Sequence, residues 1–332
     1  MGIRTSVERE STVIKIEHLT KSFQKFKALD DLTLNIAEGE IFGFIGPNGA
    51  GKSTTIKILT GLLKPTSGKA SIHGIDCTKG SIDLRYKVGY MPDNFGVYEG
   101  LRVWEYLDFF CAAYKISKNK RTDLIESVLE ITSSQRIKDF YMETLSKGMK
   151  QKAGLAKTLL HDPNVIILDE PSSGLDPRAR IEMRELIKKL KSMKKTVMVS
   201  SHILSELSEI SDKIGILEKG VLLATGTVEE VMVEFQPDFF YELEVVGEIE
   251  RAKKILLLMK KKGLIERLER VGAMFSFSIL NPKDEEAAKV LNLLLKNNIK
   301  VKNYRQVEAD LEEVFLQVTD QHGNEKDEKE VG

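Results

Sequence analysis

The chain has 332 residues, with 50 Lys and Arg against 50 Asp and Glu, and it contains 2 Cys. This balanced charge gives no indication of an anionic partner, so we expect that the chain binds no nucleic acid. Cys77 and Cys111 are too few and too unpatterned for a disulfide framework or a metal site, and we expect them to be reduced core residues.

The first segment, Met1–Ser11, is polar and charged and lacks the apolar centre of a secretory signal. No apolar run reaches the roughly 18 residues that a helix needs to cross a bilayer. We therefore expect a soluble chain that other components would have to hold at a membrane. The length favours one large domain and a smaller one.

The first predicted elements are strands. Val13–Ile16 and Leu32–Ile36 carry apolar residues at alternate positions, which is typical of half-buried strands. Ile41–Ile45 is a continuous apolar run that predicts a buried strand. A turn-rich region from 65 to 74 separates further short strands, so the first half of the chain should have a β-rich edge.

A full phosphate-loop pattern, G-x-x-x-x-G-K-[ST], lies between the last of these strands and the helix-like run Thr54–Leu59. Its glycines allow successive backbone N–H groups to converge on phosphate oxygens at a helix N-terminus. Lys52 would contact the β- and γ-phosphates, and the Ser53 hydroxyl would ligate Mg²⁺. A glycine-rich turn before an ordinary helix is the alternative, but the strand–loop–helix context favours a nucleoside triphosphate. The predicted binding residues are Gly46, Pro47, Asn48, Gly49, Ala50, Gly51, Lys52, Ser53 and Thr54.

The middle of the chain changes from helix to strand. Apolar residues recur at three- and four-residue steps from Leu101 to Tyr114, and the pattern stays helical to about residue 160. Val165–Leu168 is then a continuous apolar run that predicts a central parallel strand. A charged helix at Arg178–Lys195, a strand at Thr196–Ser200 and a segment at Lys213–Leu217 follow. This alternation indicates an α/β layered sheet.

Two carboxylates, Asp169 and Glu170, end the strand at Val165–Leu168. Parallel sheets bind their ligands at the carboxyl ends of the strands. Asp169 would hold Mg²⁺ beside Ser53, and Glu170 would polarise the water that attacks the γ-phosphate. Taken alone, such a pair is more often a solvated strand end. Because a phosphate loop precedes it in the same chain, we favour the catalytic interpretation.

After Pro237 the pattern changes to βαββαβ, the order of a ferredoxin-like unit. The strands are predicted at Tyr241–Val246, Leu264–Val271, Ala273–Leu280 and Ile299–Val307, and the helices at Ile249–Lys262 and Glu285–Lys296. A closing helix is expected at Asp310–Val318, and the charged tail after Asp320 is expected to be disordered. The alternative is that these elements merely extend the sheet of the first domain.

Five separated motifs occur in a fixed order. They are the phosphate loop, Leu145–Met149, the Asp-Glu strand, Ser173–Asp176 and His202. This order resembles the ATP-binding subunits of ABC transporters, and the resemblance covers roughly Val13 to Val231. It implies hydrolysis of ATP to ADP and phosphate with Mg²⁺.

The resemblance also implies roles for individual residues. Phe23 resembles the aromatic residue that stacks on adenine, with an ordinary half-buried strand residue as the alternative. Ser146 and Gly148 resemble the signature groups that donate hydrogen bonds to a γ-phosphate held by a second subunit. Asp176 resembles the cross-dimer loop residue. His202 resembles the residue that senses the γ-phosphate, with a surface histidine as the alternative.

The sequence departs from the usual family pattern at three positions. Asp93 stands where the family usually has a glutamine that touches Mg²⁺ and the attacking water, and its side chain is shorter and negatively charged. In the signature, Lys147 replaces a glycine and Met149 replaces a glutamine. The acid Glu170 and the histidine are intact, so we interpret the departures as variation in a working catalytic site. They resemble the bacterial export branch for drugs, antibiotics and polysaccharides.

The sequence therefore predicts an α/β fold of the P-loop NTPase type. The expected parts are an ABC-type ATP-binding domain at 13–232 with a helical subdomain at about 95–160, a ferredoxin-like α+β domain at 238–319, and a tail at 320–332. The resemblance implies membrane-spanning permease subunits as partners, at the cytoplasmic face of the cell membrane. It also implies an ATP sandwich dimer with a second copy or a paralogous ATPase subunit.

Two questions remain open at the level of sequence. The aromatic-rich stretch Tyr98–Tyr114 is either the core of the helical subdomain or a docking surface for the permease. The function also has an alternative, a soluble ATP-dependent clamp or assembly factor without transport. Relatives of that class with two nucleotide domains in one chain, or with long heptad arms, are disfavoured because neither feature occurs here.

Overall fold

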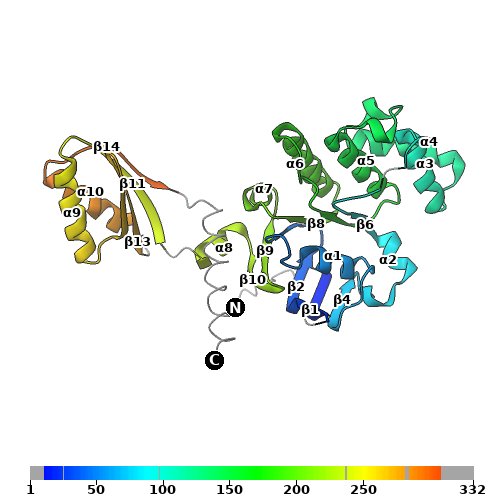
Figure 1. Ribbon diagram of the computed structural model, residues 1–332, viewed down its shortest axis with the longest axis horizontal. Coiled ribbons are helices and arrows are strands. Elements are labelled where there is room, and N and C mark those ends of the chain that lie inside the picture. Colours follow the sequence, from blue (N-terminus) through cyan, green and yellow to red (C-terminus); the bar gives the residue numbers. More distant parts are fainter. Residues whose placement is uncertain (1–10, 25, 97, 236–237, 281–283, 308–332) are drawn as a thin grey trace, which may run out of the picture. The chain divides into compact units, whose positions relative to one another are not determined.

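The computed structural model describes residues 11–24, 26–96, 98–235, 238–280 and 284–307. The chain divides between Val228 and Glu229 into two compact units, and we describe each by itself. Figure 1 shows their elements in sequence colours. The helix expected at Asp310–Val318 and the tail after Asp320 lie outside the described residues.

A six-stranded sheet forms the centre of the first unit. Its order is β10 (Val221–Gly226), β9 (Lys213–Glu218), β3 (Ile41–Ile45), β8 (Thr196–Ser201), β7 (Val165–Asp169) and β6 (Val88–Met91). All strands run parallel except β10, which is antiparallel to β9. Every residue of β3, β7 and β8 is buried, as their continuous apolar runs predict for strands covered on both faces.

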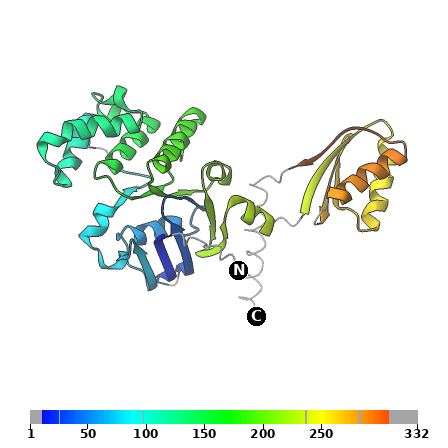
Figure 2. The same cartoon turned by 180° about the vertical axis from the view of Figure 1, so that it is seen from behind.

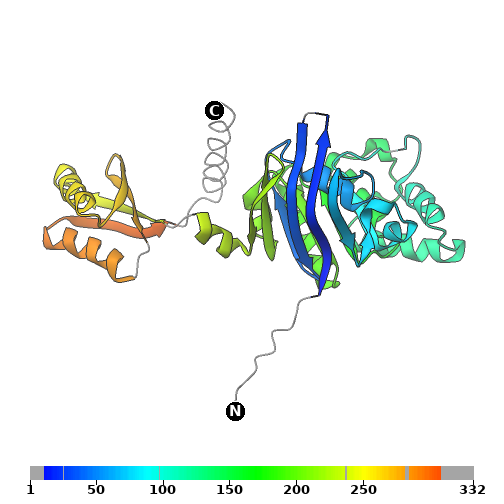
Figure 3. The same ribbon diagram turned by 90° about the horizontal axis from the view of Figure 1, so that it is seen from below.

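An antiparallel sheet of order β2–β1–β4–β5 belongs to the same unit. Its strands are β1 (Thr12–Phe23), β2 (Phe26–Ala37), β4 (Ser67–Ile72) and β5 (Ile75–Asp76), and Figure 3 shows the length of the β1–β2 pair. Apolar side chains of β1 and β2, including Ile14, Ile16 and Leu34, share one hydrophobic core with Phe42 and Phe44 of β3. This sheet is the β-rich edge that the turn-rich sequence predicts.

The helices of the first unit begin with α1 (Lys52–Leu59), directly after the phosphate loop, and α2 (Ile82–Lys87). The predicted helical part contains α3 (Val103–Ala113), α4 (Lys118–Ile131) and α5 (Lys147–Leu159), which gather beside the β6 end of the sheet (Figure 2). The remaining helices are α6 (Pro177–Ser192), α7 (Leu204–Ser208) and α8 (Val228–Phe235), the last of which begins at the unit boundary.

Aromatic residues of α3 and the preceding loop divide between core and surface. Tyr106 is buried, whereas Tyr98, Trp104 and Phe109 are exposed. Tyr106 therefore belongs to the core of the helical part, whereas docking of a permease on the exposed rings stays a prediction.

The second unit has its own four-stranded sheet, with the order β12–β13–β11–β14 and antiparallel pairing throughout. Its elements are β11 (Asp238–Val246), α9 (Ile249–Lys261), β12 (Glu266–Val271), β13 (Met274–Leu280), α10 (Asp284–Lys296) and β14 (Lys300–Val307). Leu243, Phe275, Phe277 and Leu294 are fully buried in a separate core. The elements therefore form the predicted ferredoxin-like arrangement. They do not extend the first sheet.

Candidate nucleotide-binding and catalytic site

The topology of the central sheet assembles the candidate site. Strands β6, β7, β8 and β3 are consecutive neighbours and parallel, so their carboxyl ends meet at one edge. Asp93 follows β6, Asp169 ends β7, His202 follows β8, and Gly46 follows β3. Segments that are distant in the sequence thus converge on the phosphate loop.

The phosphate loop is held by close backbone approaches at two glycines. A Cβ at Gly46 would lie 2.2 Å from the Leu217 carbonyl oxygen. Gly51 has a φ of +113° and would place a Cβ 2.7 Å from the Ala28 carbonyl oxygen. Only glycine fits such positions without displacing backbone. The loop then opens α1 at Lys52, so the backbone N–H groups at this helix N-terminus are available to an anion.

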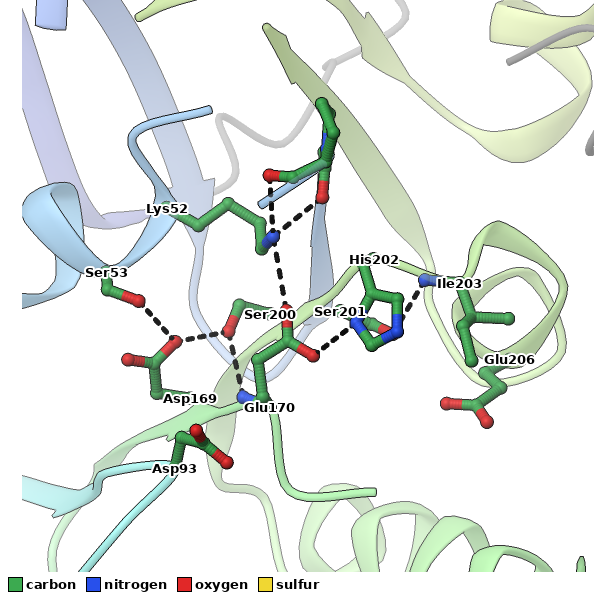
Figure 4. A network of polar contacts seen from close by, with 12 residues as sticks. Lys52, Ser53, Asp93, Asp169, Glu170, Ser200, Ser201, His202, Ile203 and Glu206 are labelled. Carbon is green, nitrogen blue, oxygen red and sulfur yellow. Dashed lines mark hydrogen bonds and ion pairs between the residues drawn. The ribbon is translucent and has the colours of Figure 1, made fainter. Parts of the chain in front are cut away.

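Lys52 is buried, and its partners are all oxygen atoms. Its Nζ donates to the carbonyl oxygens of Gly46 at 2.6 Å and Pro47 at 3.2 Å. It also forms an ion pair with Glu170 Oε1 at 3.1 Å. Figure 4 shows this side chain between the loop and the carboxylate. Phosphate oxygens are chemically equivalent acceptors, so a nucleotide in the loop would compete for this ammonium group.

Asp169 and Ser53 form a compact set of oxygen atoms. Ser53 Oγ donates to Asp169 Oδ1 at 3.2 Å, and Ser200 Oγ donates to the same oxygen at 2.7 Å. Asp169 is buried. A carboxylate beside a hydroxyl suits Mg²⁺, which binds one or two carboxylates together with substrate phosphates. The residues present therefore fit a magnesium ion.

Glu170 stands in strained backbone and is fixed on several sides. Its φ is +51°, a left-handed value that is uncommon for a side chain other than glycine, asparagine or aspartate. Its N–H donates to Ser200 Oγ at 3.0 Å, and its carbonyl accepts from Ser173 N at 3.0 Å. Its Oε2 lies 2.7 Å from His202 Nδ1 (Figure 4). This arrangement aims a carboxylate into the cleft, where it can accept a proton from water.

Asp93 is half-buried near the other acids. Burial raises the pKa of its carboxyl group, the charges of Glu170 and Asp169 raise it further, and the charge of Lys147 opposes both effects. The two residues that depart from the usual family pattern, Asp93 and Lys147, therefore interact electrostatically within one chain.

A cleft of about 430 Å³ unites most of the predicted site residues. Its lining consists of Phe23, Phe26, Ala28, Pro47, Asn48, Gly49, Ala50, Gly51, Lys52, Ser53, Thr54, Asp93, Glu170, Ser173 and His202. Phe23 and Phe26 are both exposed, and the Lys21 ammonium lies 4.9 Å from the centre of the Phe23 ring. An exposed ring at the mouth of a phosphate-binding cleft can stack on a base.

The signature and Asp176, at the end of the Ser-Gly-Leu-Asp loop, lie apart from this lining, although Ser173 of the same loop belongs to it. Ser146 is the N-cap of α5, and its Oγ accepts from Met149 N at 3.3 Å. Asp176 is the N-cap of α6, and its Oδ1 accepts from Ala179 N at 3.0 Å. Gly148 brings the two helix starts together, because a Cβ there would lie 3.2 Å from Ala179 Cβ. None of Ser146, Gly148 and Asp176 is among the residues that line the cleft.

Sequence reasoning missed Ser200, which contacts both Asp169 and the Glu170 backbone. It also missed Arg180 and Glu206, which form an ion pair at 3.2 Å beside the His202 segment. The available signal for Ser200 was its place in the strand that leads to His202, where polar side chains at a carboxyl end are candidates for a site. No motif marked the arginine and the glutamate.

A parallel sheet, a phosphate loop before a helix, and an Asp-Glu strand end define the first unit as a P-loop nucleoside triphosphatase. The family described as ABC transporter matches residues 29–173. The chain is 36% identical over 315 residues to YhcH of Bacillus subtilis (strain 168), which is described as an uncharacterized ABC transporter ATP-binding protein. The alignment covers 93% of this chain and 96% of YhcH. The chain belongs to the ATP-binding protein family of ABC transporters, and it is an ATPase.

Two further comparisons describe this family. The bacitracin transport ATP-binding protein BcrA of Bacillus licheniformis is 35% identical over 311 residues, which is 93% of this chain and 97% of that protein. A solved dimeric structure of the ATP-binding cassette MJ0796, in a post-hydrolysis state with ADP and phosphate, matches with a TM-score of 0.59 and 27% identity. The match covers 65% of this chain and 98% of the cassette. None of the helices that the structure describes is long and apolar enough to cross a bilayer.

Proposed function

We propose that the chain powers an exporter by hydrolysing magnesium-bound ATP at sites shared between two ATP-binding subunits. The observation that carries this proposal is the division of the predicted residues. The cleft contains the phosphate loop, Glu170 and His202, whereas Ser146 and Gly148 begin a helix outside its lining. A signature outside this lining would act on the phosphate bound by another subunit, either a second copy or a paralogue.

Within one subunit, the residues have distinct tasks. The loop N–H groups and Lys52 bind the phosphates, and Phe23 stacks on the base. Ser53 and Asp169 would hold Mg²⁺, which would supply charge neutralisation on the phosphate oxygens. Glu170 accepts a proton from the attacking water, and His202 holds the carboxylate through Nδ1. Asp93 contributes a hydrogen-bond acceptor at the same edge of the sheet.

The second subunit supplies the remaining groups. The Ser146 hydroxyl and the backbone at Gly148 donate to the γ-phosphate at a helix N-terminus. Asp176 lies beside this signature on the neighbouring helix start and contacts the partner across the dimer. The proposal is supported by the likeness to a dimeric cassette structure.

Transport requires membrane-spanning permease subunits, which would hold the chain at the cytoplasmic face of the membrane. The likeness to BcrA supports an exported drug or antibiotic. Co-purification with a multi-span membrane protein tests this part directly. Recovery of the active ATPase without any such protein from a cell that expresses its permease would contradict it.

Mixing inactive variants tests the shared site. Ser146→Arg adds bulk at the signature, and Lys52→Ala removes the phosphate-binding ammonium, so each variant alone should be inactive. In a mixed dimer, the phosphate loop of the first variant meets the signature of the second, and one complete site results. ATPase activity should therefore reappear on mixing and rise with protein concentration.

A second mixture is the matched control. Lys52 and Glu170 lie 3.1 Å apart in the same subunit, so a mixture of Lys52→Ala with Glu170→Gln contains no complete site. It should stay inactive at every ratio. Equal recovery in both mixtures, or no recovery in the first, would contradict the shared-site arrangement.

A further inference from the structure

We propose that Arg180 is a positioning residue that couples the Ser-Gly-Leu-Asp loop to the segment carrying His202. The inference rests on the proposed shared site, because the loop would receive the second subunit. Arg180 lies in the first turn of α6, and this first turn contains no acidic residue. A cation near a helix N-terminus is unfavourable unless other groups compensate.

The Arg180 guanidinium has two partners from different segments. Its Nε donates to the Leu175 carbonyl oxygen at 3.0 Å, one residue before Asp176. Its Nη1 lies 3.2 Å from Glu206 Oε1, in the first turn of α7. The planar guanidinium serves the two partners with two separate nitrogens, whereas the donors of an ammonium all lie on one atom. One side chain thus joins the loop before α6 to the helix after His202.

These contacts complete a ring. His202 Nδ1 meets Glu170 Oε2 at 2.7 Å, and the Glu170 carbonyl accepts from Ser173 N at 3.0 Å. The loop continues to Leu175, which is joined through Arg180 and Glu206 to α7 and back to His202. The ring surrounds a cavity of about 40 Å³, which Glu170, His202, Arg180 and Glu206 all line. A displacement of the loop is therefore passed to the carboxylate from two directions.

Glu206 is suited to transmit such a displacement. Its carboxylate is largely buried, and burial raises its pKa, while Arg180 and His202 favour the charged form. Its Oε1 faces Arg180 at ion-pair distance but accepts no well-aligned hydrogen bond within the described part of the chain. Breaking the arginine contact would leave a buried charge without compensation, so the two groups should move together.

The same two segments provide a control pair. Arg184, one turn further along α6, forms an ion pair with Glu209 at the end of α7. Arg184 also lines the cavity, but it pairs with this exposed carboxylate and, among the described residues, donates to no loop carbonyl. Arg184→Gln therefore removes an ion pair between the same helices and leaves the ring intact.

The test compares Arg180→Gln, Arg180→Lys and Arg184→Gln in the full chain. The kcat for ATP hydrolysis should fall about tenfold in both Arg180 variants, because a lysine has no second nitrogen with which to reach Glu206 while the first holds Leu175. It should stay within about twofold in Arg184→Gln. ADP affinity, measured by equilibrium dialysis, should be unchanged in all three. Adding Glu206→Ala to Arg180→Gln should cause little further loss, because both substitutions break the same link.

The outcomes separate the coupling from the proposed function. If the mixture of Ser146→Arg with Lys52→Ala described above recovers no ATPase activity, the shared site itself is wrong. If it passes while Arg180→Lys keeps full kcat, or while Arg184→Gln loses as much as Arg180→Gln, the coupling is wrong. A parallel fall in ADP affinity and kcat in Arg180→Gln would likewise assign Arg180 to structure and overturn the proposal.

Discussion

Lys52 shows how a single buried charge prepares the cleft for phosphate. Burial of an ammonium group costs free energy unless other groups compensate, and here two loop carbonyls and the Glu170 carboxylate do so. All three partners are oxygen atoms that phosphate oxygens can replace. The cost of burial is thus met before the nucleotide arrives, and the side chain is already in position.

Lys52→Ala should weaken nucleotide binding by about 30-fold or more, because truncating one member of a buried charge pair costs roughly 2 kcal/mol at least. ATP hydrolysis should be lost. Equilibrium dialysis with ADP and an ATPase assay measure the two effects. Lys57→Ala, an exposed lysine on the same helix, is the control and should match the unsubstituted chain. Unchanged affinity in Lys52→Ala would contradict the assignment of the phosphate loop.

Asp93 should lower the stability of the folded chain at neutral pH. Burial raises the pKa of its carboxyl group in the folded state above the unfolded value of about 3.9. The folded state thus binds the proton more tightly, so the Asp93 contribution to stability falls as pH rises from the unfolded pKa through the folded pKa. Asp93→Asn should therefore raise Tm at pH 7, and this gain should vanish at about pH 3.5. A gain that is equal at both pH values would contradict the argument.

Motif residues of the candidate site were predictable one by one, since each has a chemistry that its neighbours in sequence reveal. Lys52, Asp169 and Glu170 fall in this group. Ser200 had only a weak signal, because a serine at the carboxyl end of a strand becomes specific only when β8 is known to lie between β3 and β7. Arg180 and Glu206 are ordinary charged residues in amphipathic helices, and only their contact distinguishes them.

At the scale of elements, helix starts carry a double task. Ser146 and Asp176 cap α5 and α6 through their side-chain oxygens, and both are also proposed to act across the dimer. A substitution at either position therefore changes stability and function together. The two effects can be separated at Asp176, because asparagine caps a helix about as well as aspartate.

Asp176→Ala should lower the free energy of unfolding of the first unit by about 1 kcal/mol, and Asp176→Asn should change it little. Trp104, the one tryptophan of the chain, lies in α3 of this unit and reports its unfolding in urea by fluorescence. If Asp176→Asn unfolds as easily as Asp176→Ala, the side chain does not cap α6 and the hydrogen bond to Ala179 has no energetic weight.

Buried elements were the easiest to predict. β3 has the same first and last residues as the apolar run that predicted it, and β7 extends the predicted strand by one residue. β1 continues to Phe23, well beyond the predicted end at Ile16, because it pairs with β2 on one edge and β4 on the other. Pairing on both edges sustains a strand through its polar residues. β6 was missed as a strand because four residues are too few to show a period.

At the scale of the whole molecule, the site is a product of strand order. The phosphate loop, the acids and the histidine lie far apart in the chain and become neighbours because β8 lies between β3 and β7. Sequence patterns predicted a parallel sheet but not this order, since continuous apolar strands carry little information about which neighbour each one takes. The expectation that Asp169 would lie beside Ser53 came from the two motifs, because both side chains suit the same magnesium ion.

Glu170→Gln should trap the assembled state. Glutamine keeps the shape of the side chain but cannot accept a proton, so hydrolysis should fall by about 10²-fold or more while nucleotide binding persists. ATP and Mg²⁺ should then convert the chain to a dimer on size-exclusion chromatography, because no hydrolysis dissolves the sandwich. Adding Ser146→Arg to this variant should prevent the conversion. Turnover at the normal rate in Glu170→Gln would show that another group activates the water.

Each carboxylate oxygen of Glu170 already has a partner within the chain. One carboxylate oxygen meets Lys52 at 3.1 Å and the other meets His202 at 2.7 Å, so a water molecule that uses this base competes with a partner at each oxygen. Triphosphate oxygens would compete for Lys52 and so release the Glu170 oxygen that pairs with it. Nucleotide binding would thus free the oxygen that pairs with Lys52, and the base would meet the attacking water with one competing cation fewer.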